Sequence, residues 1–118
     1  MNIEEYREYC ISKPGVTESF PFNQNTLVFK VMNKMFALTN VEGFASINLK
    51  CDPDYAIELR EQHEGIKPGY HMSKKHWNTC MTDNDVPDDL LLKLIDDSYN
   101  LIVSKLTKAL KQELEDLK

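Results

Sequence analysis

The strongest constraint on the fold is a run of alternating apolar residues in the first half of the chain. Apolar side chains occupy every second position in residues 27–31 and again in residues 45–49. Because successive side chains of a strand point to opposite faces, this period of two predicts strands with one buried face. Residues 35–41 form a further apolar run, and the turn-forming pairs Asn33-Lys34 and Glu42-Gly43 separate the three runs. The pattern predicts an antiparallel meander of three strands.

Apolar residues at helical spacing surround this meander. Asn2 and the glutamate three residues later have the spacing of a capping box, which predicts a helix over residues 2–12. Asp52-Pro53 is a typical helix start, and Gly65 is expected to end that second helix. A third helix is predicted over residues 87–106, where apolar residues keep helical spacing for several turns.

Residues 66–71 and 76–81 are two short extended segments, which predict a second hairpin. The order α-β-β-β-α-β-β-α indicates an α+β domain of two layers, with helices on one face of an antiparallel sheet. We place this single domain at residues 1–106 and an amphipathic helical extension at residues 107–118. A chain of 118 residues can bury one core without a metal or disulfides.

The segment from Thr17 to Thr26 is predicted to be a loop, and it contains Phe20-Pro21-Phe22. Two rings on either side of a rigid proline make an apolar plug. We therefore expect them to cover the core as a lid rather than to contact a ligand. Glu18 beside them is expected to be a solvated carboxylate.

The composition excludes several classes of protein. Hydrophobic residues make up 42% and charged residues 28%, which is typical of folded globular domains rather than disordered chains. No apolar run approaches the ~20 residues of a membrane span, and the acidic start MNIEEYREYC does not resemble a signal peptide. We therefore expect a cytoplasmic protein without a membrane partner. The three widely spaced cysteines are expected to be free and buried.

Charge is unevenly distributed along the chain. The net charge is −5, which counts against strong non-specific binding of nucleic acid by the whole surface. Residues 20–51 nevertheless carry +2 and residues 66–81 carry +3, so the remaining segments carry −10. One basic face can attract an anion although the molecule as a whole repels it.

Residues 66–80, with the sequence IKPGYHMSKKHWNTC, concentrate unusual chemistry. They include three lysines, two of the three histidines and the only tryptophan, and they contain no acidic residue. A surface loop of ordinary composition has charges of both signs and fewer aromatic rings, so we take this stretch as the centre of the functional site. The uncovered face of the sheet is expected to add Lys30, Asn48 and Lys50.

Six segments carry a family resemblance: SKPGVTESFPF, LVFKV, MFAL, INLKCDP, KPGYHMSKKHWNTC and VPDDLLLKLIDDSYNLIVSKL. Through them the chain is similar to the MmcQ/YjbR family over about residues 3–106, most specifically in KPGYHMSKKHWNTC. The resemblance implies a small α+β fold like that of secretion chaperones, which has also been compared with frataxin-like domains. It also implies DNA binding through a double-wing arrangement of hairpins, and it transfers no catalytic residue.

We therefore expect weak binding of DNA through its phosphate backbone, and no enzymatic activity. Lysines at the hairpin tip can contact phosphates, histidines can add donors, and an aromatic ring can stack on a base. The stretch contains no arginine, the usual reader of guanine, so sequence-specific binding is not expected. The predicted nucleic-acid-binding residues are Lys50, Lys67, His71, Lys74, Lys75, His76 and Trp77. The alternative for these residues is structural, with Trp77 in the core and the lysines solvated.

Metal binding and cysteine catalysis find little support in the pattern. His71 and His76 with Cys80 or Cys51 would supply zinc ligands, but HxxxxHxxxC is not a zinc-ligand spacing. A nucleophilic cysteine needs a base. The only candidates are Cys80 with one of these histidines, and Cys51, which precedes a helix N-terminus whose dipole lowers a thiol pKa. Buried structural thiols explain both cysteines more simply, and we expect no metal and no cofactor.

A protein-interaction module is the alternative function, because the implied fold is that of chaperones. An acidic helical face and the leucines of residues 107–118 would then bind a partner protein or a second copy of the chain. This alternative predicts an exposed apolar patch on the helices. Nucleic-acid binding predicts instead that Lys50, Lys67, Lys74 and Lys75 converge on one concave face. An enzyme predicts a closed pocket in which a histidine contacts a thiol.

Overall fold

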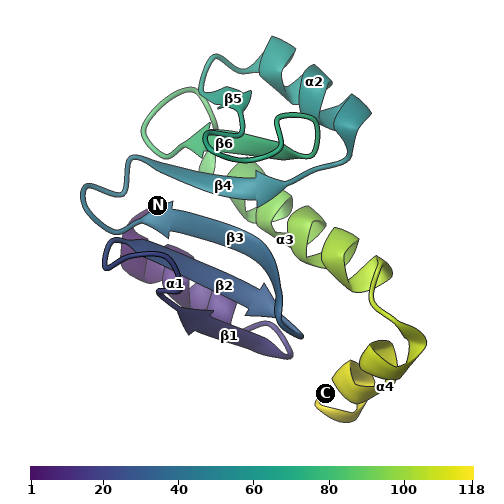
Figure 1. Ribbon diagram of the computed structural model, residues 1–118. Coiled ribbons are helices and arrows are strands. Elements are labelled where there is room, and N and C mark those ends of the chain that lie inside the picture. The colour runs from purple at the N-terminus through teal and green to yellow at the C-terminus, as the bar shows by residue number, and fades with distance from the viewer.

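The computed structural model describes all residues from 1 to 118 and shows a six-stranded antiparallel sheet with helices behind it (Figure 1). The helices are α1 (Ile3–Ile11), α2 (Pro53–Gln62), α3 (Asp88–Ser104) and α4 (Lys108–Asp116). The strands are β1 (Val16–Ser19), β2 (Thr26–Val31), β3 (Lys34–Asn40), β4 (Ser46–Lys50), β5 (Ile66–Pro68) and β6 (Trp77–Met81). The predicted α+β class is confirmed.

The strands lie in the order β1-β2-β3-β4-β6-β5, and every neighbouring pair is antiparallel. Strands β2, β3 and β4 form the predicted meander, and β5 and β6 form the predicted second hairpin. The turn between β2 and β3 has positive φ at Met32 and Asn33, 48° and 69°. Positive φ at both central residues is the turn geometry that matches the twist of two adjacent strands.

One strand is absent from the sequence prediction. Residues 16–19 form β1, which pairs with β2 and extends the sheet at its edge. The sequence predicts a loop here because the segment is only four residues long and contains a single apolar side chain. The observed order is therefore α-β-β-β-β-α-β-β-α-α. Glu18, predicted to be solvated, is instead half-buried and accepts a hydrogen bond from Arg7 Nε of α1 at 2.8 Å.

Local sequence signals set the helix starts. The side chain of Asn2 accepts a hydrogen bond from the backbone N–H of Glu5 at 2.8 Å, and the Glu5 carboxylate accepts one from the N–H of Asn2 at 3.2 Å. The predicted capping box is thus formed. At the start of α2, the Asp52 carboxylate accepts a hydrogen bond from the N–H of Tyr55 at 3.2 Å, and Pro53 occupies the first turn.

The main core lies between the sheet and the helices, all four of which bury side chains in it. The C-terminal extension packs on the domain, because Leu114 of α4 is only 2% exposed. A Cβ atom on Gly15 would lie 2.7 Å from Leu114 Cδ1, and Gly15 has φ +74°, so this approach requires glycine. None of the helices combines the length and apolar character needed to cross a bilayer.

Candidate functional site

One face of the sheet is left uncovered by the helices, and we call it the open face. Figure 1 is viewed onto it, with α1 and α3 behind the sheet. The strand register places no aspartate or glutamate on this face, whereas it places one lysine each from β2, β4 and β5 there. The open-face residues are Thr17, Ser19, Thr26, Val28, Lys30, Met35, Leu38, Asn40, Ser46, Asn48, Lys50, Lys67, Trp77, Thr79 and Met81. Positive charge without carboxylates favours an anionic partner.

The loop between β5 and β6, residues 69–76, folds back over part of the open face. Trp77 is 8% exposed and packs with Val28 and Leu38, and Met72 of the loop lies against this small cluster. The cluster is separate from the main core and holds the loop on the sheet. The ring of Trp77 therefore supports the surface from below and is not available for stacking on a ligand.

A groove remains between this loop and the loop of residues 20–25, which connects β1 to β2. It has a volume of about 600 Å³, and ligand pockets are typically ~300–1,000 Å³. The two loops come from opposite edges of the sheet, so the groove lies over the central strands β3 and β4. The apolar lining consists of Phe22, Met35, Leu38, Tyr70 and Met72. The polar lining consists of Asn23, Thr26, Thr39, Asn40, Ser46, Asn48, His71 and Thr79.

Two asparagines of the groove have their amide oxygens occupied by the fold. Asn23 Oδ1 accepts hydrogen bonds from the backbone N–H groups of Asn25 and Thr26, both at 2.8 Å. Asn40 Oδ1 accepts one from the N–H of Glu42 at 2.9 Å. Because only the oxygen of an amide can accept a hydrogen bond, these contacts fix the amide orientation. The Nδ2 nitrogen of each asparagine has no hydrogen-bond partner in the protein.

A third asparagine, Asn48, is arranged in the same way on the floor of the groove. The backbone N–H of Tyr70 donates to Thr79 Oγ1 at 2.9 Å, and the Thr79 hydroxyl donates to Asn48 Oδ1. This chain ties the β5–β6 loop to the sheet and leaves Asn48 Nδ2 without a partner. The groove thus offers three amide NH₂ groups without partners, whereas each matching oxygen already accepts at least one hydrogen bond. Such a surface suits a ligand rich in hydrogen-bond acceptors.

Exposed aromatic rings border the groove. Phe22 is 63% exposed and Tyr70 is 67% exposed, and the Tyr70 ring lies against the ring of His71 with centroids 4.0 Å apart. His71 has φ 59°, a left-handed conformation that is uncommon for residues other than glycine but that histidine adopts more often than most. Rings held open to solvent in this way are surfaces on which a flat ligand can stack.

The predicted lid over the core is wrong. Phe20 and Phe22 are 49% and 63% exposed and do not belong to the core. Strand β1 carries the chain along the sheet edge to Ser19, so the following residues leave the sheet instead of folding beneath it. The core is already filled there by Tyr6 against Phe29, whose ring centroids lie 5.5 Å apart. Phe22 belongs to the groove, and sequence reasoning missed it.

None of the predicted phosphate-binding lysines lines the groove. Lys67 and Lys50 lie on the open face, where they pair in the ladder with Thr79 and Trp77. Lys50 is half-buried, and burial, with a smaller effect of the Lys105 charge, lowers its pKa. The four lysines therefore do not form the predicted concave face, because no lysine lines the concavity.

The other predicted residues of the loop differ in their availability. Lys74 and Lys75 are exposed at the loop tip; Lys74 Nζ donates to the carbonyl of Gly69 at 3.1 Å, whereas the Lys75 ammonium makes no hydrogen bond or ion pair. His76 is half-buried, and its carbonyl accepts a 2.8 Å hydrogen bond from the residue after β4. Among the seven predicted residues, His71 is the one that lines the groove.

Arg60 of α2 anchors the loop that carries these lysines. Its Nε donates to the buried Asn78 Oδ1 at 2.7 Å, and its guanidinium also donates to the carbonyl of Lys74. Asn78 Nδ2 donates in turn to the carbonyl of Ala56 in α2 at 3.4 Å. The helix pattern alone does not indicate that Arg60 reaches a distant loop, so sequence reasoning missed this anchor.

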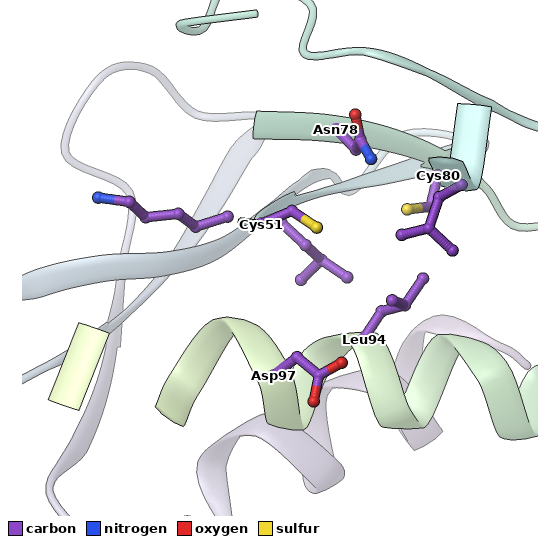
Figure 2. A pocket seen from close by; sticks show the side chains of 8 residues that line it. Cys51, Asn78, Cys80, Leu94 and Asp97 are labelled. Carbon is purple, nitrogen blue, oxygen red and sulfur yellow. The ribbon is translucent and has the colours of Figure 1, made fainter. Parts of the chain in front are cut away.

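A much smaller pocket lies on the helix side of the sheet. Its volume is about 10 Å³, room for about one water molecule. Figure 2 shows the side chains of Cys51, Cys80 and Leu94 directed toward the same gap, with Asp97 beside it on α3. Burial raises the pKa of the thiols, to about 11 for Cys51 and about 12 for Cys80. The helix dipole does not decide the Cys51 pKa, because burial and the charge of Asp52 both raise it, in keeping with a buried structural thiol.

The three cysteines are free and buried, as the sequence predicts. No histidine is hydrogen-bonded to a thiol, so the pair required of a cysteine nucleophile is not assembled. No three side chains of His, Cys, Asp or Glu come close enough together to hold a metal ion. The groove on the open face is the concave site in which polar groups and aromatic rings converge.

Comparison with known proteins places this fold among relatives without an assigned activity. The YjbR family profile matches residues 11–101. Uncharacterized protein YjbR of Escherichia coli strain K12 is 34% identical over 118 residues, covering 99% of this chain and 100% of that protein. Uncharacterized protein YbdF of Escherichia coli O157:H7 is 38% identical over 106 residues, covering 89% of this chain and 87% of that protein.

Solved structures agree with these sequence matches. The crystal structure of protein DR2400 of Deinococcus radiodurans, a DUF419 domain, is 42% identical with a TM-score of 0.90, covering 97% of this chain and 88% of that one. A Pseudomonas syringae protein is 28% identical with a TM-score of 0.72, covering 86% of this chain and 98% of that one. The resemblance expected from the sequence is thereby confirmed: the chain belongs to the YjbR family.

Proposed function

We propose that the open face binds nucleic acid weakly and without sequence specificity, and that the protein is not an enzyme. The observation that carries the proposal is the composition of this face, which has three lysines and no carboxylate in a protein of net charge −5. A polyanion therefore meets the least repulsion there. Exposed rings beside the lysines add the stacking surface that nucleic-acid-binding proteins combine with positive charge.

The lysines differ in what they contribute. Lys75 has all its donors available for phosphate oxygens, and Lys74 keeps two of its three donors after the bond to Gly69. Lys67 flanks them on the open face. Lys50 contributes less because it is half-buried and its ammonium is harder to keep charged. Contacts of this kind position a backbone without reading its sequence.

The test is fluorescence anisotropy of labelled DNA and RNA at about 50 mM and about 200 mM salt. The double variant Lys74→Ala/Lys75→Ala should lose affinity about equally for every sequence, and its salt slope should flatten by about two contacts. The matched control is Lys108→Ala/Lys111→Ala, which makes the same charge change at exposed positions of α4. Equal losses in both double variants would place the contact elsewhere, and absence of binding even at low salt would refute the proposal.

The protein-interaction alternative finds less support. The exposed large apolar side chains of the helices are Ile57 on α2 and Leu117 at the end of α4. These two helices lie at opposite ends of the molecule (Figure 1). Two separate side chains do not make the patch of several hundred Å² that such an interface requires. The other exposed large apolar residues, Phe20, Phe22 and Tyr70, are in the two loops beside the groove.

A further inference from the structure

We propose that the groove on the open face holds one unpaired base of a single-stranded nucleic acid, stacked against Phe22 and Tyr70. This assignment rests on the nucleic-acid binding proposed above and specifies its preferred ligand as a single strand and not a duplex. Three features of the groove lead to it: its rings, its free amide donors and the position of charge around it.

The rings of Phe22 and Tyr70 lie on opposite walls of the groove, where each can contact a flat ligand. Phe22 and Tyr70 belong to loops from opposite edges of the sheet, and both line the groove. They are more than half exposed, so a base that covers them removes apolar surface from water. In a duplex the faces of each base are already covered by its neighbours in the stack. Only an unstacked base offers its face to these rings.

The free donors match the edge of a base. The Nδ2 groups of Asn23, Asn40 and Asn48 lack partners, while their oxygens accept hydrogen bonds within the fold. Carbonyl oxygens and ring nitrogens of bases are acceptors, and those on the Watson–Crick edge are free only when the base is unpaired.

The lysines around the groove are placed where the phosphates of a bound nucleic-acid strand would lie. The groove is lined by uncharged side chains and His71, whereas lysines stand beside it on both sides. Lys30 pairs in the ladder with Met35, and Lys67 pairs with Thr79, and both of these partners line the groove. A neutral base in the groove with its flanking phosphates near the two lysines reproduces the alternation of neutral base and anionic phosphate along a strand.

The first test compares oligo(dT), a duplex of the same length and thymidine monophosphate by anisotropy and competition. Oligo(dT) is the probe because its bases stack weakly on one another and are easily splayed. Phe22→Ala should weaken oligo(dT) binding roughly 5- to 150-fold and leave duplex binding unchanged. The matched control is Phe20→Ala, which removes a similarly exposed ring that does not line the groove. Melting temperatures should be equal in both variants, since neither ring is in the core.

The second test addresses the amide donors. Asn40→Asp keeps the oxygen that accepts from Glu42 and removes the NH₂ group, so the turn is retained while the donor is lost. Asn25→Asp is the control, because it adds the same charge at an exposed position of the neighbouring loop that does not line the groove. We expect oligo(dT) binding to fall at least about tenfold further in Asn40→Asp than in Asn25→Asp.

The outcomes separate this inference from the proposed function. Equal affinity for single strand and duplex, with no effect of Phe22→Ala, would overturn the inference and leave nucleic-acid binding in place. Thymidine monophosphate that competes as strongly as the oligonucleotide would also overturn it, because the ligand would then be a free nucleotide. Absence of any binding at low salt would refute both this inference and the proposed nucleic-acid binding. Loss of single-strand binding in Phe22→Ala and Asn40→Asp, with both controls intact, would support it.

Discussion

The hydroxyl group of Ser98 joins α3 to the sheet, and replacing Ser98 by Ala should destabilise the protein strongly for so small a change. Ser98 is completely buried. Its Oγ accepts a hydrogen bond from the backbone N–H of Lys50 at 2.9 Å and donates one to the carbonyl of Phe36 at 2.6 Å. The ladder between β3 and β4 pairs Ala37 with Leu49, and the next pair would be Phe36 with Lys50. The hydroxyl therefore stands where a direct N–H···O bond would continue the ladder.

The magnitude follows from the two backbone groups that the substitution leaves unpaired. A buried donor or acceptor that loses its partner costs about 1–3 kcal/mol. With both groups affected, and with a gain of up to about 0.5 kcal/mol because Ala is the better helix former, we expect Ser98→Ala to lower the unfolding free energy by about 1.5–5.5 kcal/mol. For a urea m-value of about 2 kcal/mol/M, the middle of the range of about 1–3 for small proteins, the urea midpoint should fall by about 1–3 M at constant m.

Urea unfolding followed by circular dichroism measures this shift. Ser104→Ala is the matched control, because Ser104 lies on the same helix, is exposed, and bonds only to the carbonyl of Leu101 within its own turn. Hydrogen exchange of the Lys50 amide gives a local readout, and this amide should exchange faster in Ser98→Ala than in the control. If Ser98→Ala lowers the midpoint no more than Ser104→Ala does, the Lys50 N–H and the Phe36 carbonyl pair without the hydroxyl, and the bridging role of Ser98 is refuted.

Two further predictions concern the loop anchor and the buried thiols. Arg60→Ala removes the donors to Asn78 and to the carbonyl of Lys74, and hydrogen bonds of this kind contribute about 1.5–3 kcal/mol each. The loop should then open more often, so trypsin cleavage after Lys74 should rise at least about tenfold. An unchanged cleavage rate would show that the loop is held without Arg60. Burial raises the pKa of Cys10 and Cys80 from 9.0 to about 12, so above pH 9 the unfolded chain loses these protons before the folded one does. Stability should therefore fall as pH rises from about 9 toward 12, by up to about 1.4 kcal/mol per pH unit for each thiol; urea midpoints that stay constant across this range would contradict the prediction.

The parts of the fold that can be predicted from the sequence are those with a strong local pattern. The alternation in residues 27–31 and 45–49 predicts the meander correctly, and the capping box at Asn2 predicts α1 correctly. Strand β1 has no such pattern, because it is short, lies at the sheet edge and is stabilised by pairing with β2. Its omission explains the misplaced lid, since a loop at residues 17–26 is free to fold over the core and a strand ending at Ser19 is not.

Only half of the candidate site is predictable in the same way. The stretch of residues 66–80 does supply one wall of the groove, through Tyr70, His71 and Met72. The other wall is formed by the loop of residues 20–25, which is brought opposite by the order of the strands in the sheet. Strand order is a tertiary property that a local pattern does not contain. For Trp77 the sequence leaves a core role and a stacking role open; the packing of the loop buries the ring in the small cluster with Val28 and Leu38, separate from the main core.

The chemistry of the groove follows from how the fold uses its own hydrogen bonds. Turns need acceptors for their backbone N–H groups, and Asn23 and Asn40 supply them with their side-chain oxygens. Asn48 gives its oxygen to the hydroxyl that holds the β5–β6 loop. Each of these structural tasks uses an oxygen and leaves an NH₂ group, so the groove becomes rich in donors as a consequence of folding. A ligand that brings acceptors can pair with these NH₂ groups without breaking a hydrogen bond of the fold.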